Sequence, residues 1–238
     1  MQREIPRTSL NGSALVGLLA QLALVDRPTA PPSIVEGLGH WLGWKEAIPL
    51  SAALQAPPGM GVGVSAGALR TAAAPAAAAA AAVDSDFACA RQALVRAIAD
   101  EATTAREDGA SFVPFRRRYF SLQQAMETAI GPLRTRARAA VALLSPALDR
   151  LAALDGVMAQ ALAAREQTLL ALMPVLLEKH FTRLRQAPRP EPPDLPWLAV
   201  FRADMQRLLL AELELRLQPA LGLLDTLHAA PTAPHPIS

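Results

Sequence analysis

Residues 61–67 carry two short strings that resemble chemical motifs. Residues 63–67 match the Gly-x-Ser-x-Gly pattern of a nucleophile elbow, in which a strained strand-to-helix turn exposes a serine hydroxyl. Residues 61–66 resemble a dinucleotide-binding fingerprint, Gly-x-Gly-x-x-Ala, which needs a β-strand before it and a helix after it. The flanking residues are rich in Gly and Ala and show no strand pattern, so both strings are expected by chance. Neither string predicts a catalytic residue or a cofactor site.

The histidines and the cysteine do not indicate a metal site. The four histidines, at positions 40, 180, 228 and 235, lack ligand spacing, and a structural zinc site would need closely spaced Cys or His ligands. His180 follows Lys179 near a predicted helix end, where a solvated position or compensation of the helix dipole is expected. The single cysteine, Cys89, excludes an internal disulfide, suits a reducing compartment and is expected as a small buried side chain. We predict no cofactor, no metal and no enzymatic activity.

An arginine-rich stretch follows between residues 112 and 138. Its arginines are Arg116, Arg117, Arg118, Arg134, Arg136 and Arg138. Arginines beside Tyr119 and Phe120 could bind phosphates and stack on bases. Three consecutive arginines on a helix point about 100° apart and do not form one patch, whereas residues 134 and 138 share a face. The candidate interaction or nucleic-acid-binding residues are Arg116, Arg117, Arg118, Arg134 and Arg138. The alternative is a solvated face, or ion pairs with acids such as Asp100, Glu101 and Glu107.

Apolar side chains recur in steps of three and four residues from Leu144 to Lys179, which places them in one stripe on a helix. The stripe is wide enough to predict a face packed against several helices. Asp155 and Arg165 interrupt it. Buried, each would need a partner, because an unpaired buried charge costs several kcal/mol, and such pairs can fix helix register. The other interpretation, which we favour, places both at the wet margin of the stripe.

Caps and prolines predict where the long helices begin and end. A serine precedes a proline at residues 111–114 and 145–146, and both sites predict helix starts. Residues 131–132, Gly-Pro, predict a stop and restart. Pro174 has no cap beside it and predicts a kink in a helix that continues. A helix over residues 146–186 would be roughly 60 Å long at about 1.5 Å per residue, so an elongated bundle is expected.

Composition supports a helical body flanked by looser segments. Of the 238 residues 52% are hydrophobic and only 4% aromatic, so the core must be built from Leu and Ala. Residues 55–83 are rich in Gly, Ala and Pro, which predicts a flexible linker whose Gly part is disordered and whose Ala part is at most transiently helical. The predicted organisation is a disordered start at 1–8, an N-terminal helical module at 9–54, the linker at 55–83, a long-helix bundle at 84–228 with a Pro-rich connector at 187–196, and a loose tail at 229–238.

Charge and hydropathy give no sign of a membrane span. The net charge of +2 at pH 7 is too small to indicate nucleic-acid binding by itself. A span needs roughly 18 to 20 strongly apolar residues, and the closest stretch, Ala14 to Val25, is shorter. Arg3 and Arg7 before it are compatible with a signal peptide, but Glu4 and Gln21 are not, and no small-x-small cleavage site follows. We therefore expect a soluble, cytoplasmic protein.

Short strings along most of the chain outside the linker resemble an uncharacterised family of helical proteins in beta- and gamma-proteobacteria. These strings are Leu10-Asn11-Gly12-Ser13-Ala14-Leu15-Val16, Trp41-Leu42-Gly43-Trp44, Leu50-Ser51-Ala52-Ala53-Leu54, Arg136-Ala137-Arg138, Ser145-Pro146, Leu151-Ala152-Ala153-Leu154-Asp155, Arg165-Glu166 and Leu176-Leu177-Glu178. The family's function is unknown, so the resemblance implies no site residues. It does imply gene neighbours that encode membrane proteins of the proton-channel and peptidoglycan-binding envelope type, and hence an accessory or scaffold role at a membrane complex.

The sequence predicts an all-α fold: an elongated bundle of long, Pro-kinked amphipathic helices with a small N-terminal helical module. The leading hypothesis is a non-enzymatic scaffold or interaction protein, whose partners are envelope membrane proteins or a second copy of the chain. The alternative is a nucleic-acid-binding protein that uses the arginines at 116–118 and 134–138. An enzyme would require a pocket where His180, an acid and a nucleophile converge.

Overall fold

The computed structural model describes residues 14–25, 44–55, 68–104, 111–187 and 196–229. All regular structure in these ranges is helical, which confirms the predicted all-α fold. The helices are α1 (Ala14–Gln21), α3 (Trp44–Gln55), α4 (Ala68–Thr104), α5 (Val113–Ala142), α6 (Pro146–Leu170), α7 (Met173–Gln186) and α8 (Pro196–Ala229). The predicted start at 1–8, most of the 187–196 connector and most of the 229–238 tail lie outside the described residues.

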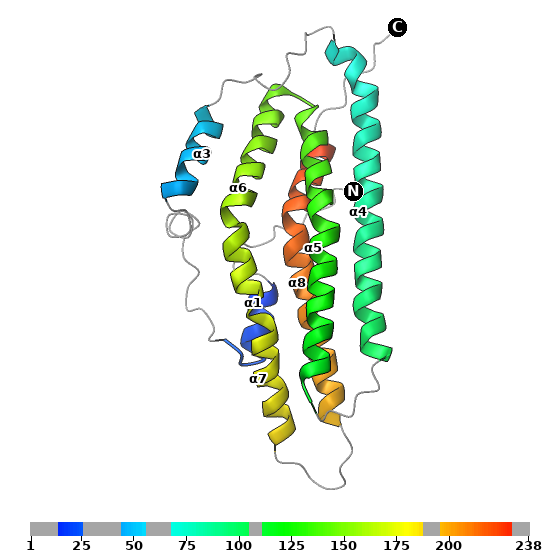
Figure 1. Cartoon of the computed structure of the whole chain (residues 1–238). Helices are drawn as coiled ribbons and strands as arrows, with labels where there is room; N and C mark the ends of the chain where they lie inside the picture. The colour runs from blue at the N-terminus through cyan, green and yellow to red at the C-terminus, as the bar shows by residue number, and fades with distance from the viewer. Residues whose placement is uncertain (1–13, 26–43, 56–67, 105–110, 188–195, 230–238) are drawn as a thin grey trace, which may run out of the picture.

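The long helices form an elongated up-and-down bundle (Figure 1). α4 runs down, α5 returns, α6 and α7 together run down again, and α8 returns, while α3 lies beside α6 and α1 lies behind the α6–α7 junction and contacts α8. α8 contacts α1, α4, α5 and α7, and α5 contacts α4, α6, α7 and α8, so these two helices lie together at the centre of the bundle. None of the helices in the described ranges combines the length and apolar character that crossing a bilayer requires.

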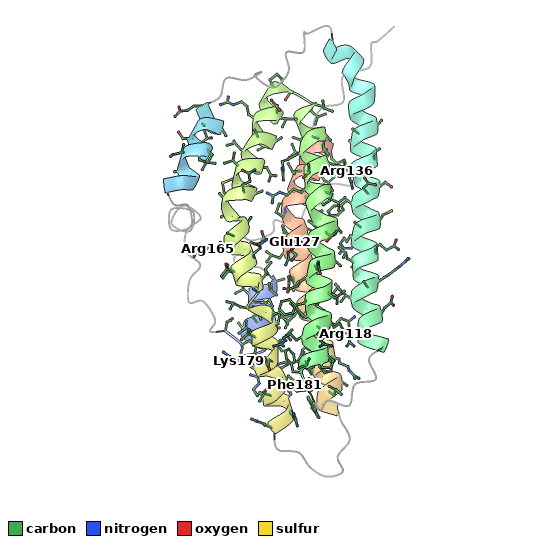
Figure 2. The ribbon with its side chains drawn as sticks, in the orientation of Figure 1. Arg118, Glu127, Arg136, Arg165, Lys179 and Phe181 are labelled. Carbon is green, nitrogen blue, oxygen red and sulfur yellow. The ribbon has the colours of Figure 1, made fainter. Side chains whose placement is uncertain are left out.

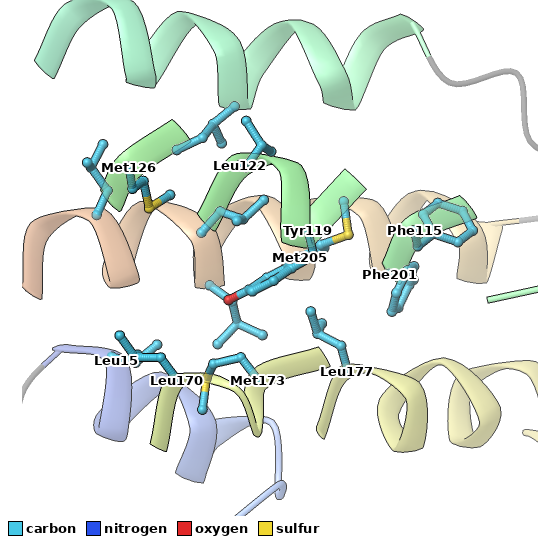
Figure 3. Packing of buried hydrophobic residues seen from close by; sticks show 14 of the residues in the cluster. Leu15, Phe115, Tyr119, Leu122, Met126, Leu170, Met173, Leu177, Phe201 and Met205 are labelled. Atoms are coloured by element: carbon cyan, nitrogen blue, oxygen red, sulfur yellow. The ribbon is translucent and has the colours of Figure 1, made fainter. Parts of the chain in front are cut away.

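The core is made mainly from the inner faces of α5 and α8. The buried apolar residues of α8 recur every three or four positions, as a helix face requires; they include Leu198, Phe201, Met205, Leu208, Leu209, Leu213, Leu217 and Leu224. Figure 3 shows two of them, Phe201 and Met205, among buried residues of α5, α7 and α1. At one end Phe115, Phe181 and Phe201 pack with ring centroids 5.1 to 5.7 Å apart, in tilted and edge-on arrangements that aromatic rings favour.

The alanine tract is helical, so the predicted linker is wrong for residues 68–83. α4 begins at Ala68 and continues through the tract. Val83 is buried, and Ala79 and Ala80 pack beside it against a second core cluster that includes Leu223 and Leu224. Alanine is the best helix former, and its small side chain lets a helix approach its neighbour closely. The composition of this segment predicted a flexible linker because composition does not reveal that the alanines pack against another helix. Residues 56–67 lie outside the described ranges.

Four of the predicted boundaries can be compared with the structure. The start predicted at residues 111–114 is present, because α5 begins at Val113, but its N-cap is Phe112, whose side chain makes no capping hydrogen bond. Ser145 caps α6, its hydroxyl accepting a hydrogen bond from the Leu148 N–H at 3.2 Å, with Pro146 as the first helical residue, as predicted. The stop predicted at residues 131–132 is wrong, because α5 runs through it. Pro132 is exposed, so water can reach the carbonyl that lacks its usual helical donor. At the kink predicted near Pro174, α6 ends at Leu170 and α7 begins at Met173, and Ala171 and Leu172 between them keep right-handed helical dihedrals. Pro174 lies in the first turn of α7, where no N–H is needed.

The leucine stripe of α6 was predicted to be buried, and this prediction is wrong. Only Ala152 and Leu170 of α6 are buried, whereas Leu151 is 42% exposed and Leu169 is 54% exposed. α6 contacts α5 on one side and α3 on another. Leu151 and Leu169 therefore remain on the outside of the bundle, and Leu148, Leu154 and Leu162 are half-buried.

Candidate functional site

A carboxylate lies at the centre of the bundle. Glu212 of α8 is fully buried. The Tyr119 hydroxyl donates to its Oε2 at 2.7 Å, and Gln123 Nε2 and Arg216 Nε donate to its Oε1 at 2.9 and 3.0 Å. All three partners are donors, which suits an ionised carboxylate, and Arg216 supplies the opposite charge. The carboxylate is thus fully engaged with the protein.

Gln123 extends this network to the end of a third helix. Its Nε2 also donates to the Leu170 carbonyl oxygen at 3.1 Å. Leu170 is the last residue of α6, where helix carbonyls lack intrahelical donors. One side chain of α5 therefore connects α8 with the junction between α6 and α7.

Tyr119 is strongly perturbed by this environment. Its ring is fully buried. Burial is the main cause that raises the pKa of Tyr119 well above its usual value, and the negative charge and hydrogen bond of Glu212 raise it further, while Arg216 opposes them. A phenol beside an anion acts here as a hydrogen-bond donor that keeps its proton.

A second buried polar cluster joins α7 to α8. His180 and Asp204 are each 2% exposed, and His180 Nε2 lies 2.7 Å from Asp204 Oδ2. Arg207 pairs with the other oxygen of Asp204, and Arg183 Nη2 lies 2.8 Å from His180 Nδ1. The predicted solvated position of His180 is therefore wrong, because α8 brings a buried acid against it.

Asp155 is bound by two of the predicted arginines. Arg134 Nε donates to Asp155 Oδ2 at 3.0 Å, and Arg138 Nε lies 2.8 Å from the same oxygen. The three side chains are only 18 to 25% exposed. This ion-paired cluster ties α5 to α6 and leaves Arg134 and Arg138 poorly placed for phosphates. Arg165, the other charge of the stripe, is exposed and is labelled in Figure 2.

The first arginine triplet divides between the surface and the core. Arg116 and Arg117 are exposed. The Arg118 guanidinium lies over the Phe115 ring, 5.8 Å from its centroid, at the lower end of α5 in Figure 2. The structure therefore separates the five candidate arginines: residues 116 and 117 face solvent, and residues 118, 134 and 138 contact other side chains.

These clusters hold an acid and a base without a nucleophile beside them. The hydrogen-bond partners described for His180 are the Asp204 carboxylate, which Arg207 also contacts, and the Arg183 guanidinium; neither is a hydroxyl or thiol. Cys89 is exposed, so its predicted burial is wrong. Within the described ranges, no three His, Cys, Asp or Glu side chains gather to bind a metal. The Gly-x-Ser-x-Gly string lies outside those ranges.

The two acids that organise these clusters, Asp204 and Glu212, were not predicted as site residues from the sequence. They are eight residues apart, and Leu208 lies four residues from each, a spacing that places all three on one apolar face of the helix. Their place on an apolar face could have identified them as candidate site residues, because buried acids need hydrogen-bond or ion-pair partners. The partners themselves could not be found from spacing, since Tyr119 and His180 lie far away in sequence.

Comparison with protein-family models matches residues 1–229 to a family described as "Protein of unknown function (DUF3348)". No curated protein matches the chain, and no solved structure matches it.

Tyr119 gives a direct test of the buried network, because it is the single tyrosine of the chain. In the folded protein its tyrosinate absorbance should stay flat as the pH rises through about 10, the usual tyrosine value. Its raised pKa means that the folded state keeps a proton which the unfolded state loses, so the free energy of unfolding should fall above that pH. Tyr119→Phe should remove this part of the alkaline decline. Titration of Tyr119 near pH 10 in the folded protein would contradict the burial.

Glu212→Gln tests the carboxylate itself. The change leaves Arg216 without its partner and should lower the free energy of unfolding by about 3 kcal/mol, as for broken buried pairs. Glu214→Gln is the matched control, because Glu214 is 42% exposed and pairs with Arg91 at the surface, where such pairs contribute about 1 kcal/mol or less. Urea denaturation followed by circular dichroism measures both. Equal losses in the two variants would argue against a special role for Glu212.

Proposed function

Because the chain belongs to the DUF3348 family of proteins of unknown function, we propose from its own structure that it is a non-enzymatic helical scaffold or interaction protein. In this proposal the bundle is a rigid support, and its outer helices bind protein partners. The buried clusters hold the support together and take no part in chemistry.

The observation that supports this proposal is an exposed apolar surface at the junction of α6 and α7. We call Leu169, Leu172 and Val175 the junction patch; they are 54%, 49% and 50% exposed. They follow one another at three-residue spacing, and Leu170 and Met173 between them are buried. A group of exposed large aliphatic side chains is typical of a surface that binds another protein. The junction patch is thus supported from below by the core and is open on its outer side.

The buried polar clusters support a non-enzymatic role because their acids and histidine are shielded from solvent. Glu212, Asp204 and His180 are almost completely buried and hydrogen-bonded to protein groups. A catalytic acid or base must reach a substrate proton, and these groups face side chains instead. Their geometry suits cross-links between helices.

A membrane complex of the cell envelope is the partner that we favour. The family resemblance implies neighbouring genes for envelope membrane proteins, and the described helices contain no span of their own. We therefore propose a cytoplasmic accessory protein that binds such a complex, or a second copy of itself, through the junction patch.

Charge substitution in the junction patch tests the proposal. The double variant Leu169→Glu with Leu172→Glu should abolish self-association in light scattering, or retention of envelope proteins on the immobilised chain, because a carboxylate in an apolar interface must be desolvated. Leu143→Glu is the control, since Leu143 is 59% exposed but lies just beyond the end of α5. A wild-type chain that is strictly monomeric and retains nothing from its own cell's membrane fraction would contradict the proposal.

A second candidate function is nucleic-acid binding, supported by one stripe on α5. Val113, Arg116, Arg117 and Phe120 are exposed and spaced as one helix face. Two guanidinium groups beside an exposed phenyl ring could contact phosphates and stack on a base. The engagement of Arg134 and Arg138 with Asp155 makes this surface smaller than the sequence suggested.

Gel-shift titration at two salt concentrations tests this second function. Binding should weaken as salt rises, and Arg116→Ala with Arg117→Ala should lower affinity several-fold at low salt. The control is Arg91→Ala with Arg136→Ala, because both arginines are exposed and paired with acids of neighbouring helices. No binding by the wild-type chain at low salt would end this candidate.

A further inference from the structure

α1 is a short helix that depends on the bundle for its stability. It has eight residues, fewer than the roughly 12 to 15 that an isolated helix needs in water. Leu15 and Leu19 are buried in the first core cluster, and Figure 3 shows Leu15 next to Leu170 and Met173. After the helix Ala23 adopts a φ of 51°, and the Leu24 N–H reaches back to the Leu19 carbonyl at 2.9 Å. That left-handed conformation is unfavourable for a residue with a Cβ atom, so contacts from the bundle must compensate.

One guanidinium nitrogen provides such a contact. Arg183 Nη2 donates to the Leu22 carbonyl at 2.6 Å and lies 2.8 Å from His180 Nδ1. The two hydrogens of this nitrogen serve the two acceptors, one each, so Nδ1 is unprotonated. The proton of His180 is then on Nε2, which donates to Asp204 at 2.7 Å. In this arrangement, the guanidinium nitrogen that holds α1 also donates to a neutral imidazole.

We propose that His180 and Arg183 form a proton-controlled latch that holds α1 on the bundle. When a proton from solvent binds Nδ1, the new N–H points at the Arg183 guanidinium. Two positively charged donors then face each other with no acceptor between them. Arg183 is exposed, so it can turn to water and release the Leu22 carbonyl. Histidine is the side chain whose charge ordinarily changes between about pH 5 and 8.

The charged groups around His180 determine which helix contact is lost when the imidazole is protonated. On α8 it faces Asp204, which Arg207 also contacts, and on its own helix it faces Arg183. Residues 14–25, with α1, contain no ionisable side chain, and Arg118 of α5 lies over the Phe115 ring. The imidazolium keeps Asp204 as its partner, so α7 and α8 stay joined. The contact that is lost is the one to α1.

Release of α1 would enlarge the junction patch. Leu170 and Met173, which pack with Leu15 in the same cluster, would become accessible beside Leu169 and Leu172. This consequence rests on the proposed function, whereas the latch itself does not. A test of α1 docking therefore distinguishes failure of the latch from failure of the partner-binding proposal.

Hydrogen exchange of the full-length chain measures the latch. Amide protection over residues 15–24, corrected with an unstructured peptide of the same sequence, should fall about tenfold or more between about pH 8 and about pH 5. Protection in α8 should not change. Arg183→Ala should show the low α1 protection at both pH values, because the donor is absent. His228→Gln is the control: His228 pairs with Asp84 between α8 and α4, and its loss should leave the response intact.

His180→Gln, which cannot be protonated in this range, should hold α1 protection independent of pH. If this variant does not fold, an NMR titration of His180 in the wild-type chain replaces it, and the midpoint of that titration must coincide with the loss of α1 protection. Wild-type protection that is equal at both pH values, a response that persists in folded His180→Gln, or separate midpoints would each overturn the latch.

Discussion

Helix α8 carries two carboxylates into the core, and the neighbouring helices must supply hydrogen-bond donors for them. Glu212 and Asp204 lie on the same face of α8 as its buried leucines. Leaving either unpaired would cost several kcal/mol, because an ion loses its hydration on burial. α5 therefore supplies Tyr119 and Gln123, and α7 supplies His180. The position of each neighbouring helix along α8 follows from this requirement.

This constraint gives the bundle a register that its apolar side chains alone would not. Leucine and alanine faces can slide past one another with little change in buried area, and aromatic residues are few. A hydrogen bond of 2.7 Å between side chains of two helices allows almost no such movement. The ion pairs contribute less to stability than to uniqueness, since well-packed apolar residues can replace a buried pair without loss. We attribute the fixed alignment of α5, α7 and α8 to these pairs.

The sequence predicted the helical class and the cap at Ser145 because both depend on local chemistry. It failed where tertiary packing decides the outcome. The alanine tract at 68–83 resembled a linker until α8 supplied a surface for it, and the α6 stripe resembled a core face although α5 and α8 occupy the centre. His180 was expected in solvent because its partner, Asp204, lies beyond a connector. The family relationship covers residues 1–229 and brings no function with it, so the candidate sites come from the geometry alone.

Pairing of charged side chains also determines which arginines remain available at the surface. Arg134 and Arg138 are engaged by Asp155, so they tie α6 to α5 and contribute little free charge. Arg116 and Arg117 stay in solvent on the outer side of α5, and Leu169 and Leu172 stay in solvent at the end of α6. A partner would therefore meet the outer helices, while α8 remains inside and keeps their spacing constant. α1 differs from the long helices, because it packs on core leucines through apolar contacts and accepts a hydrogen bond from an exposed arginine. It supplies none of the side chains of the buried pairs that join α5, α7 and α8.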